Sequence, residues 1–392
     1  MRFVTLLHTF ISISLLSILS LGAVSATAQS GPVAERASGF DGPLASRPES
    51  PASAQTAASQ VEPARRWAKV LRVPGRLKAV DLGLVINEDD PYSVKVGEYY
   101  IKARKIPDAN VLRVRLPVKP SLSRAEFEVV VKAINDHLGD KIQALALAWR
   151  MPYAVECNGL TGALAMGFDA KLCQQTCAAS RPSRYYGGYS SRPYRDTGMR
   201  LAMHLAAKDV EQAQRMIDRG VSSDGTLGLR GAPLVNVHMV TTSDKVRSQR
   251  QMLFPPAGKV AAAGIEVHLD QTDAVRDVSR VLMYLTGKDR VDGLNSVQFV
   301  PGALADHLTS YGGMLDGNHG QMTALSWIEA GATATYGTAS EPCSHLQKFP
   351  HPQALLLFYL GGATAIEAYW KSVAWPQQGV FVGEPLAAPF GR

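Results

Sequence analysis

The chain has 392 residues, of which 46% are hydrophobic and 19% are charged, and this composition is typical of a globular protein with a large core. The formal net charge is +7, but the basic residues are scattered and no basic and aromatic stripe accompanies them, which argues against nucleic-acid binding. One local basic stretch, Arg65 to Lys78, is interpreted as a solvated segment; contact with anionic lipid or cell-wall polymer is the alternative.

The first 28 residues have the pattern of a signal peptide. Arg2 supplies the positive start, Phe10 to Val24 is an apolar run, and Ala26-Thr27-Ala28 fits a small-x-small cleavage site. A transmembrane anchor is the alternative, but the apolar run is short for a span of about 20 residues. We therefore expect a periplasmic or secreted protein.

Residues 29–66 are rich in Ala, Ser, Pro and Gln and contain few large apolar side chains, which predicts a disordered linker. Residues 67–392 are expected to form a single α/β domain. Its first part alternates strands and helices with short connections, and this pattern predicts a mostly parallel sheet flanked by helices. The predicted strands are 81–87, 110–118 and 142–149, and the predicted helices are 92–105 and one that begins with a capping box at Ser123.

An insertion over about residues 151–198 interrupts this alternation and holds three of the four cysteines. An even number of cysteines in an exported chain favours two disulfides, and four cysteines allow three pairings. We favour Cys173 with Cys177, which closes a small loop, and Cys157 with Cys343. A metal site and a nucleophilic cysteine are the alternatives, but neither CxxC nor HxxxH spacing supports a metal site.

The second half of the domain continues the α/β pattern. Its predicted strands are 234–242, 265–269, 296–302, 332–338 and 379–383, and its predicted helices are 208–219, 273–284, 323–329, 354–360 and 364–373.

Polar side chains capable of chemistry come at the predicted ends of these strands, which is where α/β proteins build their sites. Asp306, His307 and Ser310 supply the carboxylate, imidazole and hydroxyl of nucleophilic hydrolysis. Caps and turns are the plainer interpretation, and oxygen ligation of a hard cation is a further alternative. We expect no resident metal or cofactor, since no GxGxxG or Walker pattern is present. The candidate catalytic residues are Asp306, His307, Ser310 and Glu341, and the candidate binding residues are Asn87, Asp89, Asp90, Arg150, Thr309 and Glu384.

Several segments together resemble a secreted bacterial family of conserved hypothetical proteins, over about residues 80–390. They are NEDDPYSVKVGEYYIKARKIPDANVLRV, WRMPYAVECN, PGALADHLTSYGG, GATATYGTASEP and GEPLAAPF. The closing order GATATYGT, GGATAIEAYW and VGEP is also similar to that of the caspase-like gingipain peptidases, which use a His-Gly loop and then a Cys at successive strand ends. Here Thr309-Ser310-Tyr311 stands where that Cys would be, and the one His-Gly pair, His319-Gly320, follows it. The resemblance implies a caspase-like sheet without the peptidase dyad.

Three hypotheses about function follow. The first is an exported, non-catalytic binding or envelope-interaction module whose partner is an envelope component or a small ligand. The second is a serine- or metal-dependent hydrolase with its site at the carboxyl edge of the sheet. In the third, the polar strand ends are purely structural and cap helices or pair with one another.

Overall fold

The structure is a computed structural model that describes residues 70–392. The predicted signal peptide (residues 1–28) and linker (residues 29–66) lie outside the described residues, so both stay predictions. Among residues 70–392, no helix is both long enough and apolar enough to cross a bilayer.

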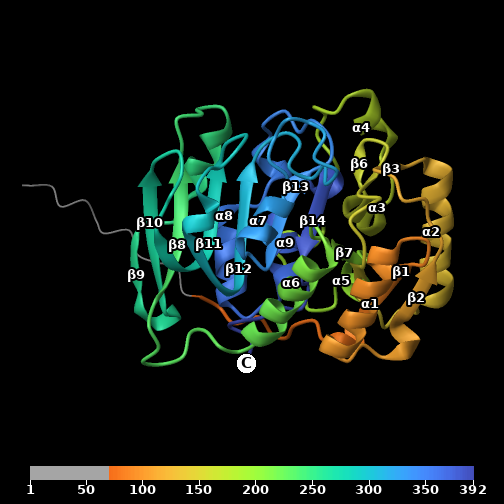
Figure 1. The fold of residues 1–392 in the computed structure, drawn as a ribbon, viewed down its shortest axis with the longest axis horizontal. Coiled ribbons are helices and arrows are strands. Elements are labelled where there is room, and N and C mark those ends of the chain that lie inside the picture. Colours follow the sequence, from red (N-terminus) through yellow and green to blue (C-terminus); the bar gives the residue numbers. More distant parts are fainter. Residues whose placement is uncertain (1–69) are drawn as a thin grey trace, which may run out of the picture. The chain divides into compact units, whose positions relative to one another are not determined.

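An eleven-stranded sheet runs through the domain in the order β2-β1-β4-β7-β14-β13-β12-β11-β8-β10-β9 (Figure 1). Within its first part the strands are mutually parallel, as the alternation of strands and helices predicts. The first part consists of β1 (Leu82–Asn87), β2 (Val111–Val114), β4 (Ala144–Leu147) and β7 (Leu201–His204).

The second part of the sheet is also parallel, except at two strands. The closing strand β14 pairs antiparallel with β13, and the short β9 pairs antiparallel with β10. Its strands are β8 (Val235–Thr241), β9 (Gly258–Val260), β10 (Ile265–Gln271), β11 (Val278–Gly287), β12 (Val297–Leu308), β13 (Ala334–Thr338) and β14 (Gly379–Gly383). The α/β class with a large, mostly parallel sheet is therefore confirmed.

Helices cover the first part of the sheet on both faces. Helix α1 (Pro91–Arg104) begins where the Asp90 side chain accepts from the Tyr92 amide, and Pro91 occupies its first position. Helix α2 (Arg124–His137) begins with the expected capping box of Ser123 and Glu126. The core on the α2 side is separate from the larger core on the α1 side.

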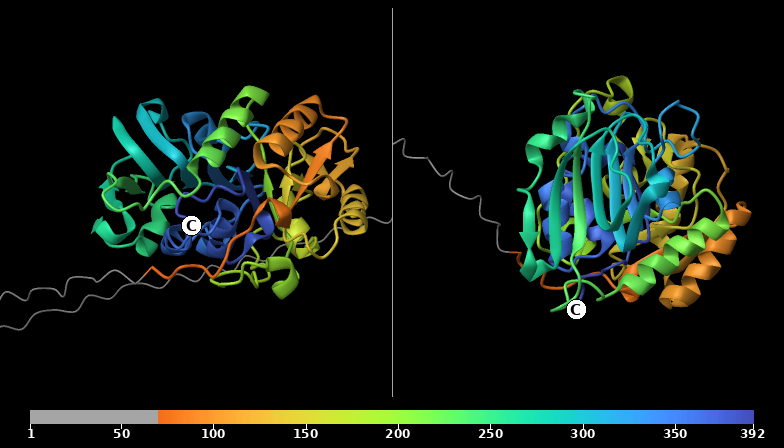
Figure 2. Two further views of the ribbon diagram at one scale, coloured as in Figure 1. Left: turned by 90° about the horizontal axis from the view of Figure 1, so that it is seen from below. Right: turned by 60° about the vertical axis from the view of Figure 1, so that its left-hand side comes forward.

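Helix α6 (Val210–Ser223) follows β7 and lies beside α1 (Figure 2). Three more helices pack on the second part of the sheet: α7 (Leu325–Ala330), α8 (Pro352–Leu360) and α9 (Ala365–Ser372). Helix α9 is buried along its whole length, and its Trp370 stacks on Phe381 of β14. A 3-10 helix, η3 (Arg247–Leu253), contacts the ends of β8 and β11.

The predicted insertion folds into short elements rather than one long loop. Two strands, β5 (Ala154–Val155) and β6 (Asn158–Gly159), join β3 (Ser121–Leu122) in a small second sheet. Three short helices follow in the chain: α3 (Leu160–Met166), α4 (Ala170–Gln174) and α5 (Pro193–Thr197).

Two disulfides are present, but the predicted pairing is wrong. Cys157 is bonded to Cys173, and Cys177 to Cys343. The pairing differs from the prediction because the Asn158 side chain forms two hydrogen bonds with the backbone of Asp169. These bonds hold the start of α4, and with it Cys173, beside β6 and Cys157. Cys177 then lies beside the loop after β13, where Nε2 of His345 forms a hydrogen bond with the Cys177 carbonyl oxygen. Two disulfides indicate an oxidising compartment.

Two secondary-structure predictions in the second half need correction. The segment predicted as a helix over 273–284 contains the start of β11, which pairs with β12 along its length and with β8 over Val281–Leu285. This nonlocal pairing suits the run Val281 to Leu285, which is apolar and β-prone. Strand β12 is also longer than the predicted 296–302 and continues to Leu308, so Asp306 and His307 lie within the strand rather than after it.

Candidate functional site

Asp306 is fully buried near the end of β12, where a buried arginine neutralises it. Nη1 of Arg250, on η3, lies 2.5 Å from Oδ1 of Asp306, and both side chains are almost fully enclosed. Burial raises the pKa of Asp306, and the Arg250 charge opposes that rise. Arg250 also donates to the Thr286 carbonyl at the end of β11. The pair therefore clamps η3 against β11 and β12.

Both ring nitrogens of His307 are occupied by hydrogen bonds inside the core. Trp327 Nε1 donates to Nδ1 over 2.9 Å, and Nε2 lies 2.9 Å from the Met322 carbonyl oxygen. Since an indole N–H only donates and a carbonyl only accepts, the ring is neutral with its proton on Nε2. Burial lowers the pKa of His307 to about 4. In this arrangement neither nitrogen is available to take a proton from a serine.

Thr309 and Ser310 follow β12 and take part in loop contacts. The Thr309 hydroxyl donates to Oε1 of Gln321, and Nε of Arg247 donates to the same hydroxyl. The Ser310 carbonyl accepts from the hydroxyl of Thr338 at the end of β13. These bonds tie the loop after β12 to η3 and to β13.

Glu341 lies in the loop after β13 and holds a turn beside the disulfide. Its Oε1 accepts from the backbone N–H of Cys343 over 2.7 Å, and its carbonyl accepts from Gln378. The neighbouring Ser340 donates to the Cys157 carbonyl. Glu341 and Ser340 together join the loop after β13 to the insertion and to the segment before β14, and among the described residues no hydrogen bond or ion pair joins Glu341 to Asp306 or His307.

The candidate residues of the first part of the sheet also make structural contacts. Asn87 is buried and bonds both backbone groups of Leu116 through its side chain. Asp89 forms an exposed ion pair with Arg115, while Asp90 is the N-cap of α1. Arg150 is half-buried and donates to the Lys208 carbonyl over 3.4 Å.

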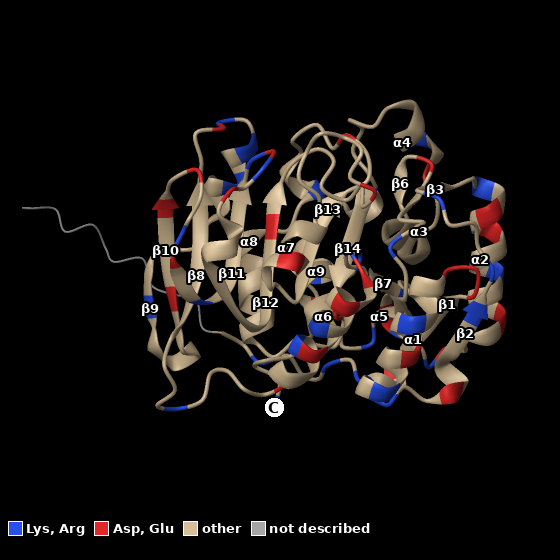
Figure 3. Ribbon diagram, in the orientation of Figure 1, with Lys and Arg blue, Asp and Glu red and all other residues tan. Residues whose placement is uncertain are grey.

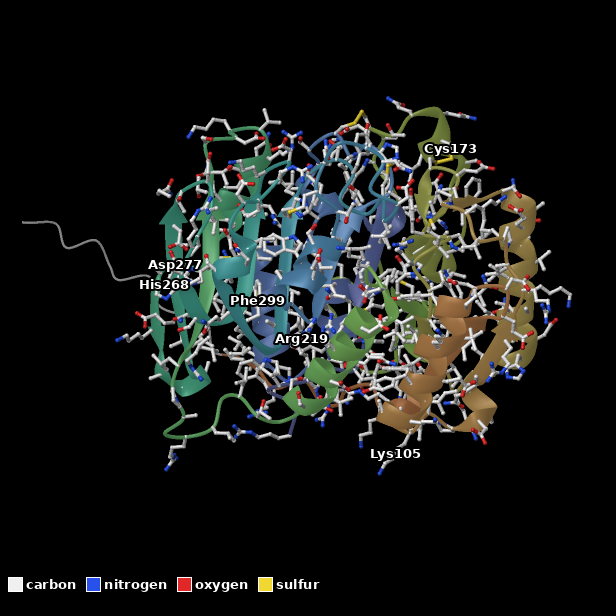
Figure 4. All side chains as sticks on the ribbon, in the orientation of Figure 1. Lys105, Cys173, Arg219, His268, Asp277 and Phe299 are labelled. Carbon is white, nitrogen blue, oxygen red and sulfur yellow. A yellow bond between two sulfur atoms is a disulfide. The ribbon has the colours of Figure 1, made fainter. Side chains whose placement is uncertain are left out.

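Glu384 follows β14 and pairs with α1 instead of facing a strand-end site. Its carboxylate accepts from Nη2 of Arg104 over 2.5 Å and from the Tyr100 hydroxyl over 2.6 Å. The side chain is fully buried. In Figure 4, Lys105 just after α1 lies at the opposite end of the molecule from Cys173 in the insertion.

Neither the disulfides nor any acidic cluster provides an evident metal centre. Across residues 70–392, no group of three or more His, Cys, Asp or Glu side chains is placed to hold a metal ion. Elsewhere Lys and Arg are interspersed with Asp and Glu along α1 and α2 (Figure 3). The scattered charge agrees with the sequence.

A cavity of about 650 Å³ lies elsewhere, between α2, α3, the insertion and the start of β7. Its apolar wall includes Phe127, Val131 and Ile134 of α2, and Arg181, Arg184 and Arg200 also line it. The predicted strand-end residues do not contribute to it. The sequence shows Arg181 and Arg184 only as part of a polar stretch, so their meeting with Arg200 comes from the tertiary fold.

Comparison of the chain with protein-family models, with curated proteins and with solved structures found no match.

Proposed function

We propose that the chain is an exported, non-catalytic binding protein of the cell envelope, built on a caspase-like sheet. The observation that carries the proposal is the engagement of both His307 nitrogens by Trp327 and Met322. A hydrolase that used Ser310 would need a ring nitrogen free to accept its proton. Asp306, the carboxylate of the same proposed triad, is committed to Arg250.

The caspase-like assignment rests on the closing order of elements. The small-residue strand β13, the helix α9 with Glu367 near its start, and the final strand β14 follow one another as the peptidase resemblance implies. Thr309-Ser310-Tyr311 follows β12, where those peptidases carry their cysteine. Export is supported by the signal-peptide pattern together with two disulfides that leave no free cysteine among the described residues.

The test is activity-based labelling and a hydrolase screen on the mature, oxidised protein. A fluorophosphonate probe and panels of ester, peptide and phosphoester substrates, each with and without divalent cations, are expected to give neither labelling nor turnover. Ser310→Ala is the matched control, since it removes only the hydroxyl under suspicion. Labelling or turnover that disappears in Ser310→Ala would overturn the proposal, and so would turnover that requires added metal.

A further inference from the structure

The cavity between α2 and the insertion combines an apolar wall with three arginines that form no ion pair within residues 70–392. Arg200 is 4% exposed, and its guanidinium donates to Asn135 Oδ1 and to backbone carbonyls at the end of α2 and before β4. Tyr194 stacks on its face at 3.9 Å. In the described part of the chain, Arg200 has no carboxylate partner within ion-pair distance. Its direct acceptors are neutral, and burial lowers the pKa of Arg200, although the Asp140 charge acts on it from beyond ion-pair distance. A buried charge without a directly paired anion is costly.

Two more arginines reach the same cavity from the insertion. Arg181 donates to the Met166 carbonyl at the end of α3. Arg184 packs against Gly198: a Cβ atom built on Gly198 would lie 3.3 Å from Nη2 of Arg184. Both side chains are exposed, and neither is in an ion pair with any residue of 70–392. The cavity lining contains no Asp or Glu. Three arginines thus line one space. Guanidinium groups bind carboxylate and phosphate through paired hydrogen bonds.

The remainder of the lining is apolar and adaptable. Phe127, Val131, Ile134, Leu164, Met166 and Met199 supply it. Methionine and leucine side chains accommodate flexible hydrocarbon, and the volume of about 650 Å³ lies within the usual range for small-ligand sites. A more open pocket lies along the same helix and shares Phe127, Val131 and Asn135 with the cavity. Charged side chains of α2 supply half of its lining, so the hydrocarbon is confined to the cavity itself.

We propose that this cavity binds a single-chain amphiphile whose anionic head, a carboxylate or a phosphate, pairs with Arg181, Arg184 and Arg200. The proposal rests on the non-catalytic binding function and names its ligand class. The hydrocarbon tail lies on the α2 wall. Arg200 forms the floor that neutralises the head, and the two insertion arginines close over it from the solvent side.

The test is calorimetric titration of the mature, disulfide-bonded protein with three probes that share a tail. Dodecanoate and dodecyl phosphate carry anionic heads, and dodecyltrimethylammonium carries a cationic one; all are used below their aggregation concentrations. One-to-one binding of an anionic probe without binding of the cationic probe is expected, and the tighter of the two identifies the head. Failure of both anionic probes to bind would overturn the proposal, as would equal binding of the cationic probe.

Variants locate the binding. Arg181→Gln and Arg184→Gln change exposed side chains, so folding is preserved, and each is expected to weaken binding by about tenfold. Arg230→Gln, a change at an exposed arginine remote from the cavity, should leave affinity unchanged. Val131→Trp fills the cavity and should abolish binding, whereas Val129→Trp, on the exposed side of the same helix, should not. Wild-type affinity in the arginine variants and in Val131→Trp would refute the assignment.

The two proposals fail in different experiments. If the protein binds no amphiphile and also shows no hydrolase labelling, the ligand assignment is wrong. The non-catalytic function then still stands. Turnover that depends on Ser310 removes the proposed function whatever the amphiphiles do.

Discussion

Lowering the pH from 7 to 5 is expected to destabilise the folded protein through two buried histidines. Burial lowers the pKa of both His204 and His307 to about 4. A histidine in an unfolded chain has a pKa of about 6.5, so between these values the unfolded state binds more protons than the native state. The free energy of unfolding therefore falls as the pH falls. The contribution is complete above about pH 6.5 and is lost progressively toward pH 4.

The size of the effect follows from the two pKa values. Integrating the proton-binding difference from pH 7 to pH 5 gives a loss of about 2 kcal/mol for each histidine, and of about 4 kcal/mol for the two together. Buried carboxyl groups act in the opposite direction, because burial raises the pKa of Asp306 and of Glu367. A comparison of variants is therefore needed to isolate one histidine.

His307→Gln is the informative variant. The glutamine amide keeps one donor for Met322 and one acceptor for Trp327, but it does not titrate. Urea unfolding at pH 7 and at pH 5, followed by tryptophan fluorescence without reductant, should show a pH-dependent loss about 2 kcal/mol smaller than in wild type. His137→Gln, at an exposed histidine of α2, serves as the control and should behave as wild type. An unchanged pH dependence in His307→Gln, or an NMR midpoint for His307 near 6.5, would refute the reasoning.

The remaining predictions concern the cross-links and a buried ion pair. Cys177→Ser with Cys343→Ser opens a loop of 166 residues and should lower the free energy of unfolding by about 5 kcal/mol, against about 3 kcal/mol for the bridge that closes 16 residues. Urea titrations of the two disulfide variants measure the free energy of unfolding of each. An equal loss of free energy in both variants would contradict the loop-entropy explanation. Glu384→Ala removes the buried carboxylate that pairs with Arg104 and should cost about 3 kcal/mol in the same assay. Asp218→Ala removes only an exposed hydrogen bond from the Tyr99 hydroxyl and should cost under about 1 kcal/mol.

The sequence predicts the architecture well wherever the local signals are strong. The capping box at Ser123 and the closing strand 379–383 stand where predicted, and the helix predicted over 92–105 is observed over 91–104. These signals depend on neighbours within a few residues, so no tertiary information is needed to interpret them. The segment 273–284 fails because its strand is fixed by pairing with β8 and β12, which lie far away in the sequence.

The strand end beside the candidate site is harder to predict from the sequence, for a related reason. The sequence puts Asp306 and His307 after a strand, because the apolar run before them stops at Pro301 and Gly302. In the structure Gly302 adopts a positive φ of 86° and the strand continues beyond it. Asp306 and His307 then lie inside the core, where a polar side chain is stable only when it has hydrogen-bond or ion-pair partners. Arg250 and Trp327 supply these partners from distant segments, which the sequence alone does not reveal.

Two places in the fold contain a buried charged side chain: the end of β12 and the cavity lined by arginines. They differ in whether the buried charge is paired with an opposite charge of the protein. Asp306 and Arg250 are buried 2.5 Å apart, so each supplies the opposite charge of the other within the protein. Arg200 is buried to a similar degree, but its acceptors are an amide oxygen and backbone carbonyls. It therefore has no directly paired carboxylate among the described residues, and it lines a cavity together with Arg181 and Arg184. When an anion enters a cavity beside an unpaired buried cation, it stabilises that cation. The same interaction contributes to the binding free energy of the anion. On this ground the arginine-lined cavity, rather than the end of β12, is the place where the fold favours a ligand.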